Sequence, residues 1–182
     1  MPAEDTWTPP AQWCPQPRYW HADDGDATEH EVTGLVAAFV RALQPEVTVE
    51  TGSYLGQTSE AIGLALQQNG HGRLWTVERD PDRAAQAQAR CAGLPVEVVT
   101  DDSLSWAPPG DIGFAWVDGG SDRAAEISRL LGSFIPGAVL GMHDAGPQHQ
   151  FTAQVQPLIQ AGHLKPITLH TPRGVMFAEV YP

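Results

Sequence analysis

The chain has 182 residues, a formal net charge of −12 and 42% hydrophobic residues, which suits one domain with a core of its own. Charged residues make up only 18%, and apolar runs recur regularly, so the composition argues against disorder. With Lys165 as its single lysine, the chain is not expected to bind nucleic acid or an anionic membrane. Its two cysteines are too few for a disulfide scaffold or a structural zinc site, and no apolar stretch is long enough to span a bilayer.

The first 27 residues have an unusual composition. Their five prolines forbid a long helix or a central strand, and their three tryptophans are costly to leave in water. We therefore expect residues 1–27 to form an arm or lid that lies across a domain formed by residues 28–182. Because Glu4 and Asp5 interrupt the N-terminus, no secretory signal is expected, and a reduced, cytoplasmic setting is the default.

A helix is predicted over residues 29–44. Residues 28–31 (Thr-Glu-His-Glu) form the pattern of a capping box, in which Thr28 accepts from the backbone N–H of Glu31 and the Glu31 carboxylate reaches back. Apolar positions then follow helical spacing until Pro45 ends the helix. The apolar stripe of this helix packs either on the domain or on a second subunit of a homodimer.

Short apolar runs alternate with helix-like stretches along the rest of the chain, which is the pattern of a parallel sheet with crossover helices. Only three residues, 171–173, separate the last two runs. That gap is too short for a parallel crossover, so the sheet should end with an antiparallel strand. The expected strands are 46–50, 73–78, 95–100, 112–118, 137–142, 164–170 and 174–181, and the expected helices are 57–69, 81–92, 122–132 and, interrupted by Pro157, 149–161.

The first strand runs into a glycine-rich turn, residues 50–59 (Glu-Thr-Gly-Ser-Tyr-Leu-Gly-Gln-Thr-Ser). Gly52 and Gly56 let the backbone approach a ligand at the N-terminus of the next helix, where unpaired N–H groups point outward. The turn is not a dinucleotide fingerprint, because Tyr54 stands where a glycine would have to admit a pyrophosphate. Taken alone, any tight joint between a strand and a helix gives such a pattern.

Polar residues also end the next two strands. Glu78 ends the second, where a carboxylate can accept both hydroxyls of an adenosine ribose bound over the first turn. After the third strand, Asp102 and Ser103 can hydrogen-bond an adenine, with Asp101 as the surface residue of the pair. These positions predict a nucleoside site at the carboxyl edge of the sheet.

Carboxylates end two further strands. Asp118 ends the fourth, and Asp144 follows His143 at the end of the fifth. Neighbouring strands lie about 4.8 Å apart, so Asp118 and Asp144 could share one divalent cation, for which hard oxygen ligands favour Mg²⁺. The alternative is that both aspartates only cap the loops after their strands.

Together, these motifs resemble the class I S-adenosylmethionine-dependent methyltransferases. They are most similar to the small O-methyltransferase-like group that ends its fourth strand in Asp-Gly and its fifth in His-Asp, and the resemblance covers residues 28–181. It implies an α/β, Rossmann-like methyltransferase fold with a seven-stranded, mostly parallel sheet in the order 3-2-1-4-5-7-6, strand 7 antiparallel, and helices on both faces. It also implies S-adenosylmethionine as the cofactor.

The resemblance further implies roles for single residues. The metal ligands of metal-dependent members correspond to Asp118 and Asp144. The chain departs from the family pattern at two places: Ser121 follows the Asp-Gly-Gly of strand 4 where many relatives have histidine, and Ala145 stands where a third metal ligand, asparagine, is found, so His143 or waters would complete a metal site. The implied cofactor contacts are Glu50, Gly52, Ser53, Tyr54, Gly56 and Thr58 of the first turn, Glu78 at the ribose, Asp102 and Ser103 at the adenine, and Asp118.

The expected reaction moves a methyl group to the hydroxyl of a small molecule, with Asp118, His143 and His21 as candidate catalytic residues. A Mg²⁺ between Asp118 and Asp144 would lower the pKa of that hydroxyl. Without metal, His143 is the natural general base, because its ordinary pKa lies near neutrality. His21 reaches the same site if the N-terminal segment folds over it as a lid, whose aromatic residues would exclude water and select an apolar or aromatic acceptor. The structural alternatives are a hydrogen-bonded histidine and a simply packed arm.

Two other functions compete with this one. The missing histidine and asparagine also suit a cofactor-binding or assembly protein that kept the fold and lost turnover, and a methyl-release assay separates the two. A nicotinamide-dependent oxidoreductase is disfavoured by Tyr54 in the glycine turn.

Overall fold

The computed structural model describes residue 14, residues 16–120 and residues 122–182. Its helices are α1 (His30–Leu43), α2 (Gln57–Asn69), α3 (Pro81–Arg90), α4 (Arg123–Leu130) and α5 (Phe151–Gln160), with short 3-10 helices η1 (Pro17–Tyr19) and η2 (Leu131–Ser133). Its strands are β1 (Val47–Thr51), β2 (Arg73–Glu78), β3 (Val96–Thr100), β4 (Ile112–Val117), β5 (Phe134–His143), β6 (Leu164–Leu169) and β7 (Val175–Val180).

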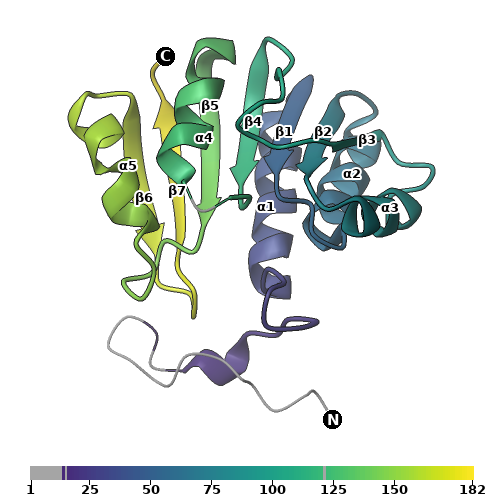
Figure 1. Ribbon diagram of the computed structural model, residues 1–182, viewed down its shortest axis with the longest axis horizontal. Coiled ribbons are helices and arrows are strands. Elements are labelled where there is room, and N and C mark those ends of the chain that lie inside the picture. The colour runs from purple at the N-terminus through teal and green to yellow at the C-terminus, as the bar shows by residue number, and fades with distance from the viewer. Residues whose placement is uncertain (1–13, 15, 121) are drawn as a thin grey trace.

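The strands in the described part of the chain form one seven-stranded sheet in the order β3-β2-β1-β4-β5-β7-β6 (Figure 1). Strands β1 to β5 pair in parallel, whereas β7 pairs antiparallel with both β5 and β6. The predicted topology and the antiparallel end of the sheet are therefore confirmed. Because β1 to β5 are parallel, their carboxyl ends meet at one edge, which is where ligands bind in open α/β sheets.

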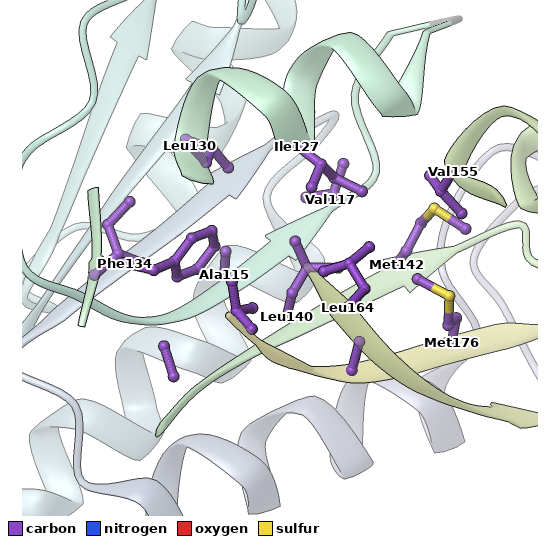
Figure 2. Close-up of a cluster of buried hydrophobic side chains, with 14 of the residues drawn as sticks. Ala115, Val117, Ile127, Leu130, Phe134, Leu140, Met142, Val155, Leu164 and Met176 are labelled. Carbon is purple, nitrogen blue, oxygen red and sulfur yellow. The ribbon is translucent and has the colours of Figure 1, made fainter. Parts of the chain in front are cut away.

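Helices cover both faces of the sheet, and each face has its own apolar core. Ile127 and Leu130 of α4 and Val155 of α5 point toward strand residues such as Leu140 and Met142 on one face (Figure 2). On the other face, α1 and α2 pack over the sheet. The apolar stripe of α1, formed by Val32, Val36 and Val40, is buried against the domain, which is the first of the two alternatives left open for this helix. The buried residues of that second core include Ile62, Leu66, Leu74, Phe114, Trp116 and Phe177.

The element bounds differ from expectation mainly at β5 and α5. Strand β5 starts at Phe134 rather than at residue 137, with an irregular register against β4. Helix α5 continues through Pro157, although this proline was expected to interrupt it. None of the helices in the described ranges has both the length and the hydrophobicity needed to cross a bilayer.

The capping box predicted for residues 28–31 is wrong. Helix α1 begins at His30 with Glu29 as its N-cap residue, and no side chain caps it. Thr28 Oγ1 donates instead to Asp118 Oδ2, 3.0 Å away. The Glu31 carboxylate accepts from the backbone N–H of His21 at 2.9 Å and also pairs with the His21 ring. Thr28 and Glu31, which a capping box would have joined to each other's backbone, are therefore bonded to residues elsewhere in the chain.

The described part of the N-terminal segment, drawn in purple, lies below the sheet edge at which β4 and β5 end (Figure 1). It enters α1 through Ala27, Thr28 and Glu29, which are buried. Of the three tryptophans on which the lid prediction depended, Trp7 and Trp13 lie outside the described residues, and Trp20 is partly buried.

Candidate active site

A cavity of about 330 Å³ opens at the carboxyl edge of the parallel strands. Its walls come from the glycine turn after β1, the ends of β2 and β3, the loops after β4 and β5, helix α4 and residues 26–28 of the N-terminal segment. The structure brings together there most of the residues that the sequence selected: Gly52, Ser53, Tyr54, Thr58, Glu78, Asp102, Ser103, Asp118 and Asp144.

Other predicted site residues do not line the cavity. Among the described residues, His21, Glu50, Gly56 and His143 lie outside its walls. The His21 ring is half exposed, and its Nδ1 lies 2.8 Å from Glu31 Oε1. Gly56 makes room for α3, because a Cβ atom there would lie 2.8 Å from the Ala87 Cα.

Gly52 allows the turn after β1 to touch the loop after β4. Its φ is +80°, a conformation that glycine adopts without strain. A Cβ atom at this position would lie 2.5 Å from the carbonyl oxygen of Asp118. Any side chain here would push the two loops apart and open the floor of the cavity.

Glu78 is held in place by backbone donors. Its Oε2 accepts from the N–H of Tyr54 and its Oε1 from the N–H of Asp80, each at 3.0 Å. The carboxylate therefore ties the glycine turn to the end of β2. Since each carboxylate oxygen can accept a second bond, Glu78 keeps acceptor capacity toward the cavity.

Asp102 and Ser103 are partly engaged within the protein. Asp102 Oδ1 accepts from the backbone N–H of Leu104 at 2.8 Å, and the Ser103 hydroxyl bonds to the Glu126 carboxylate. Asp101, expected as the surface residue of the pair, lines the cavity as well.

Glu50 lies behind the cavity wall and is fully buried. Its Oε2 accepts from the hydroxyls of Ser59 and Thr76, the latter at 2.6 Å. The pKa of Glu50 is raised to about 7, chiefly by burial and also by the charges of Asp118 and Glu78, while the two hydrogen bonds act in the opposite direction. The charges of the cavity carboxylates therefore affect the pKa of Glu50, although Glu50 does not line the cavity.

A group of charged side chains lies where β4 and β5 end, and we call it the ion-pair cluster: Glu29, Asp118, Arg123, His143, Asp144 and Arg173. His143 and Glu29 are completely buried, with Nε2 and Oε2 2.7 Å apart. His143 Nδ1 lies 3.2 Å from Asp118 Oδ2. Burial alone would lower the pKa of His143, but the charge and hydrogen bonding of Asp118 and Glu29 raise it to about 10. A histidine in this environment is protonated at neutral pH, so it is unsuited to the role of proton acceptor expected from the sequence.

Two arginines complete the ion-pair cluster. Arg123, 3% exposed, donates to Asp118 Oδ1 at 3.0 Å. Arg173 forms a two-pronged pair with Asp144, with Nε–Oδ1 at 2.6 Å and Nη2–Oδ2 at 2.8 Å. Burial raises the pKa of Asp118, but His143 and Arg123 bring it below its ordinary value.

Sequence reasoning missed Glu29, Arg123 and Arg173 as site residues. Glu29 resembled part of a helix cap, Arg123 an ordinary residue of a helix, and Arg173 part of a hairpin turn. A signal was available for Arg123, because it lies on the first turn of the helix that follows the Asp-Gly of β4. For Glu29, separated from His143 by most of the chain, no local pattern gives the contact.

Comparison with known proteins places the chain in a family. A family model described as a methyltransferase domain matches residues 49–145, more than half of the chain. The chain therefore belongs to this methyltransferase family, and the resemblance to the class I methyltransferases is confirmed. A search of curated proteins found no match.

Several solved structures share the fold. The O-methyltransferase TomG from Streptomyces achromogenes, involved in tomaymycin synthesis and solved with S-adenosylmethionine, is 23% identical, with a TM-score of 0.66, over 86% of this chain and 82% of its own. The O-methyltransferase from Bacillus cereus, solved with S-adenosylhomocysteine, is 16% identical, with a TM-score of 0.75, over 87% of this chain and 84% of its own. The methyltransferase PaMTH1 from Podospora anserina, also solved with S-adenosylhomocysteine, is 15% identical, with a TM-score of 0.74, over 93% of this chain and 86% of its own.

Proposed function

We propose that this chain is an S-adenosylmethionine-dependent methyltransferase that acts on a hydroxyl group of a small molecule. The observation that carries the proposal is the convergence of Gly52, Glu78, Asp102 and Asp118 on one cavity at the carboxyl edge of the sheet. Family membership supports methyl transfer, and the structural neighbours solved with S-adenosylmethionine or S-adenosylhomocysteine support this cofactor.

The cavity suits a nucleoside cofactor that carries a positive sulfur. Glu78, fixed by two backbone donors, has free lone pairs for the two ribose hydroxyls. Asp102 and Ser103 stand where an adenine would lie, and the glycine turn stands beside the methionine part. Carboxylates outnumber guanidinium groups among the lining residues, which favours a cationic ligand.

In the reaction, the acceptor oxygen forms a bond to the methyl carbon while the carbon–sulfur bond breaks, the hydroxyl proton is released and S-adenosylhomocysteine remains. The enzyme's main task is to align oxygen, carbon and sulfur. Asp26, Ala27 and Thr28 contribute to the cavity wall, so the N-terminal segment covers the reacting groups and excludes water. In this proposal, residues 16–27 act as the described part of a lid.

Calorimetric titration with S-adenosylmethionine, followed by a methyl-release assay over a panel of phenols and alcohols, tests the proposal. Binding together with release from at least one hydroxyl compound supports it. Binding without release from any compound, amines and carbon acids included, supports the alternative of a cofactor-binding protein without turnover. Absence of binding at millimolar S-adenosylmethionine contradicts both.

A homodimer and a cytoplasmic location stay predictions. Light scattering tests the first, and fractionation of the native host tests the second.

A further inference from the structure

The carboxylates at the ends of β4 and β5 lie close enough to hold a metal ion. Potential donor atoms of Asp118, His143 and Asp144 lie within 4.8 Å of one another. The family resemblance implies a divalent cation at this place in metal-dependent members. Whether the donors fit such an ion depends on what each of them already binds.

Both oxygens of Asp118 are engaged. Oδ1 accepts from Arg123 Nη2 at 3.0 Å, whereas Oδ2 accepts from the Thr28 hydroxyl at 3.0 Å and lies 3.2 Å from His143 Nδ1. The other ring nitrogen of His143, Nε2, lies 2.7 Å from Glu29 Oε2. A divalent cation at Asp118 would therefore share Oδ1 with a guanidinium, while Oδ2 already has two partners.

Asp144 is engaged to the same degree. Its two oxygens accept the bidentate pair from Arg173, and His149 Nε2 lies 3.3 Å from Oδ1. Two parallel hydrogen bonds from a guanidinium to a carboxylate are among the strongest charged contacts in proteins. Arg173 is itself anchored, because its Nη1 donates to the carbonyl oxygens of Gly25 and Ala27 at 3.2 and 3.3 Å.

A single nitrogen of Arg123 lies between the two carboxylates. Its Nη2 is 3.0 Å from Asp118 Oδ1 and 3.8 Å from Asp144 Oδ2. The guanidinium cannot easily move aside: Nη1 donates to the Gly120 carbonyl at 2.8 Å, and the group lies 4.4 Å above the centre of the Phe151 ring. A divalent cation placed here would face two guanidinium charges at contact distance, and a buried repulsion of that kind is strongly unfavourable.

We propose that the Arg123 guanidinium, rather than a divalent cation, is the positive charge that joins Asp118 and Asp144, so that the chain needs no divalent metal for methyl transfer. The exclusion of a divalent cation follows from the arginine–carboxylate pairs alone. The statement that methyl transfer needs no metal rests, in addition, on the proposed function. Arg123 acts as a positioning residue that holds the two carboxylates at the cavity wall.

Titration of the full chain with Mn²⁺, followed by electron paramagnetic resonance of the free ion, tests the inference directly. The wild type should show no saturable binding up to about 1 mM Mn²⁺, a concentration that fills even weak carboxylate sites. Replacing both guanidiniums, in Arg123→Met/Arg173→Met, should free the carboxylates and tighten Mn²⁺ binding by about tenfold or more, the size of effect that groups next to metal ligands have. Arg129→Met is the matched control, since Arg129 lies on the same helix, is exposed and, within the described part of the chain, donates to the carbonyl oxygens of residues 105 and 106.

One saturable Mn²⁺ site in the wild type that is lost in Asp144→Asn would overturn the inference. A foldable double variant that gains no Mn²⁺ affinity would overturn it as well, because the arginines would then not be what excludes the ion. If the double variant does not fold, Arg123→Lys, which keeps the charge, is expected to remain without a Mn²⁺ site, and a site appearing there contradicts the inference.

The rate of methyl release provides a separate test. Methyl release by the wild type should be the same within about twofold in EDTA as in Mg²⁺, because metal catalysis by charge stabilisation would supply several kcal/mol. Loss of turnover in EDTA would overturn the inference. If S-adenosylmethionine does not bind at all, the proposed function fails, while the Mn²⁺ titration still decides between arginine and metal.

Discussion

The glycine-turn side of the cavity, formed by the ends of β1 and β2 with Gly52, Tyr54 and Glu78, differs in construction from the ion-pair cluster at the ends of β4 and β5. On the glycine-turn side, the key contacts join backbone groups at the ends of adjacent strands to one side chain, as between Glu78 and the N–H groups of Tyr54 and Asp80. In the ion-pair cluster, side chains from the start of α1, the ends of β4 and β5, α4 and the β6–β7 hairpin neutralise one another.

The difference has a physical consequence. Backbone donors are fixed once the strands have paired, so the glycine-turn side is preorganised for a ligand with many hydrogen-bonding groups. Buried charges in the ion-pair cluster must all be paired at once, because an isolated one is costly in a low-dielectric interior. We therefore expect mutations in the cluster to lower stability first, and mutations on the glycine-turn side to lower cofactor affinity first.

The largest effect is expected from Glu29→Gln. Removing one charge of the fully buried Glu29–His143 pair should lower the free energy of unfolding by about 4 kcal/mol, the usual cost of breaking a buried ion pair. Chemical denaturation monitored by circular dichroism measures it. Glu31→Gln is the matched control: Glu31 lies two residues away and also pairs with a histidine, but both partners are about half exposed. That change should cost less than about 1 kcal/mol. Equal losses in the two variants would contradict the buried pairing.

The next effect concerns the opposite side of the cavity. Glu78→Ala should weaken S-adenosylmethionine binding by about 100-fold, since two hydrogen bonds to a charged acceptor are lost. The free energy of unfolding should change less than in Glu29→Gln. Isothermal titration measures the affinity, and Glu97→Gln, an exposed strand carboxylate paired with Arg73, serves as the control without effect. An unchanged affinity in Glu78→Ala would remove the ribose assignment.

The same contrast explains what the sequence could predict. The topology and the positions of Gly52, Glu78 and Asp118 at strand ends follow from the alternation of apolar runs, because strand ends in a parallel sheet share one edge. The pairing of Glu29 with His143 joins residues 114 positions apart, and no periodicity encodes such a contact. His143 shows the limit clearly: its ordinary pKa suggested a base, but Asp118 and the buried Glu29 keep it charged, and sequence spacing does not place Glu29 beside it.

Glu50, on β1 behind the cavity wall, gives a smaller effect that depends on pH. In the unfolded chain Glu50 ionises near its ordinary pKa of 4.5, whereas in the folded protein its pKa is about 7. Between these values only the folded state still holds the proton, so the contribution of Glu50 to stability falls as pH rises. Glu50→Gln removes this loss and should raise the free energy of unfolding by about 3 kcal/mol at pH 8. Near pH 4, where Glu50 is protonated in both states, the same substitution should give no such gain.

Denaturation of both proteins across this pH range measures the difference. Glu46→Gln, at an exposed position just before the same strand, should show no pH-dependent gain. A gain for Glu50→Gln that is constant with pH would mean that the carboxylate ionises normally in the fold.

The smallest effect tests whether the N-terminal segment closes over the glycine-turn side. The Tyr54 hydroxyl donates to Asp24 Oδ2 at 3.0 Å, and Gln57 Nε2 donates to Asp23 at the same distance, so two contacts hold this segment against the turn. Tyr54→Phe removes the first contact and leaves the Arg83 guanidinium over the ring, 4.8 Å from its centre. Because an exposed hydrogen bond contributes about 1 kcal/mol, S-adenosylmethionine should dissociate up to about fivefold faster, with little change in the free energy of unfolding. Stopped-flow dissociation measures this rate, and Tyr19→Phe, an exposed tyrosine of η1, is the control. If both variants release the cofactor at the wild-type rate, Asp24 does not hold a lid, and the segment only forms a fixed wall of the cavity.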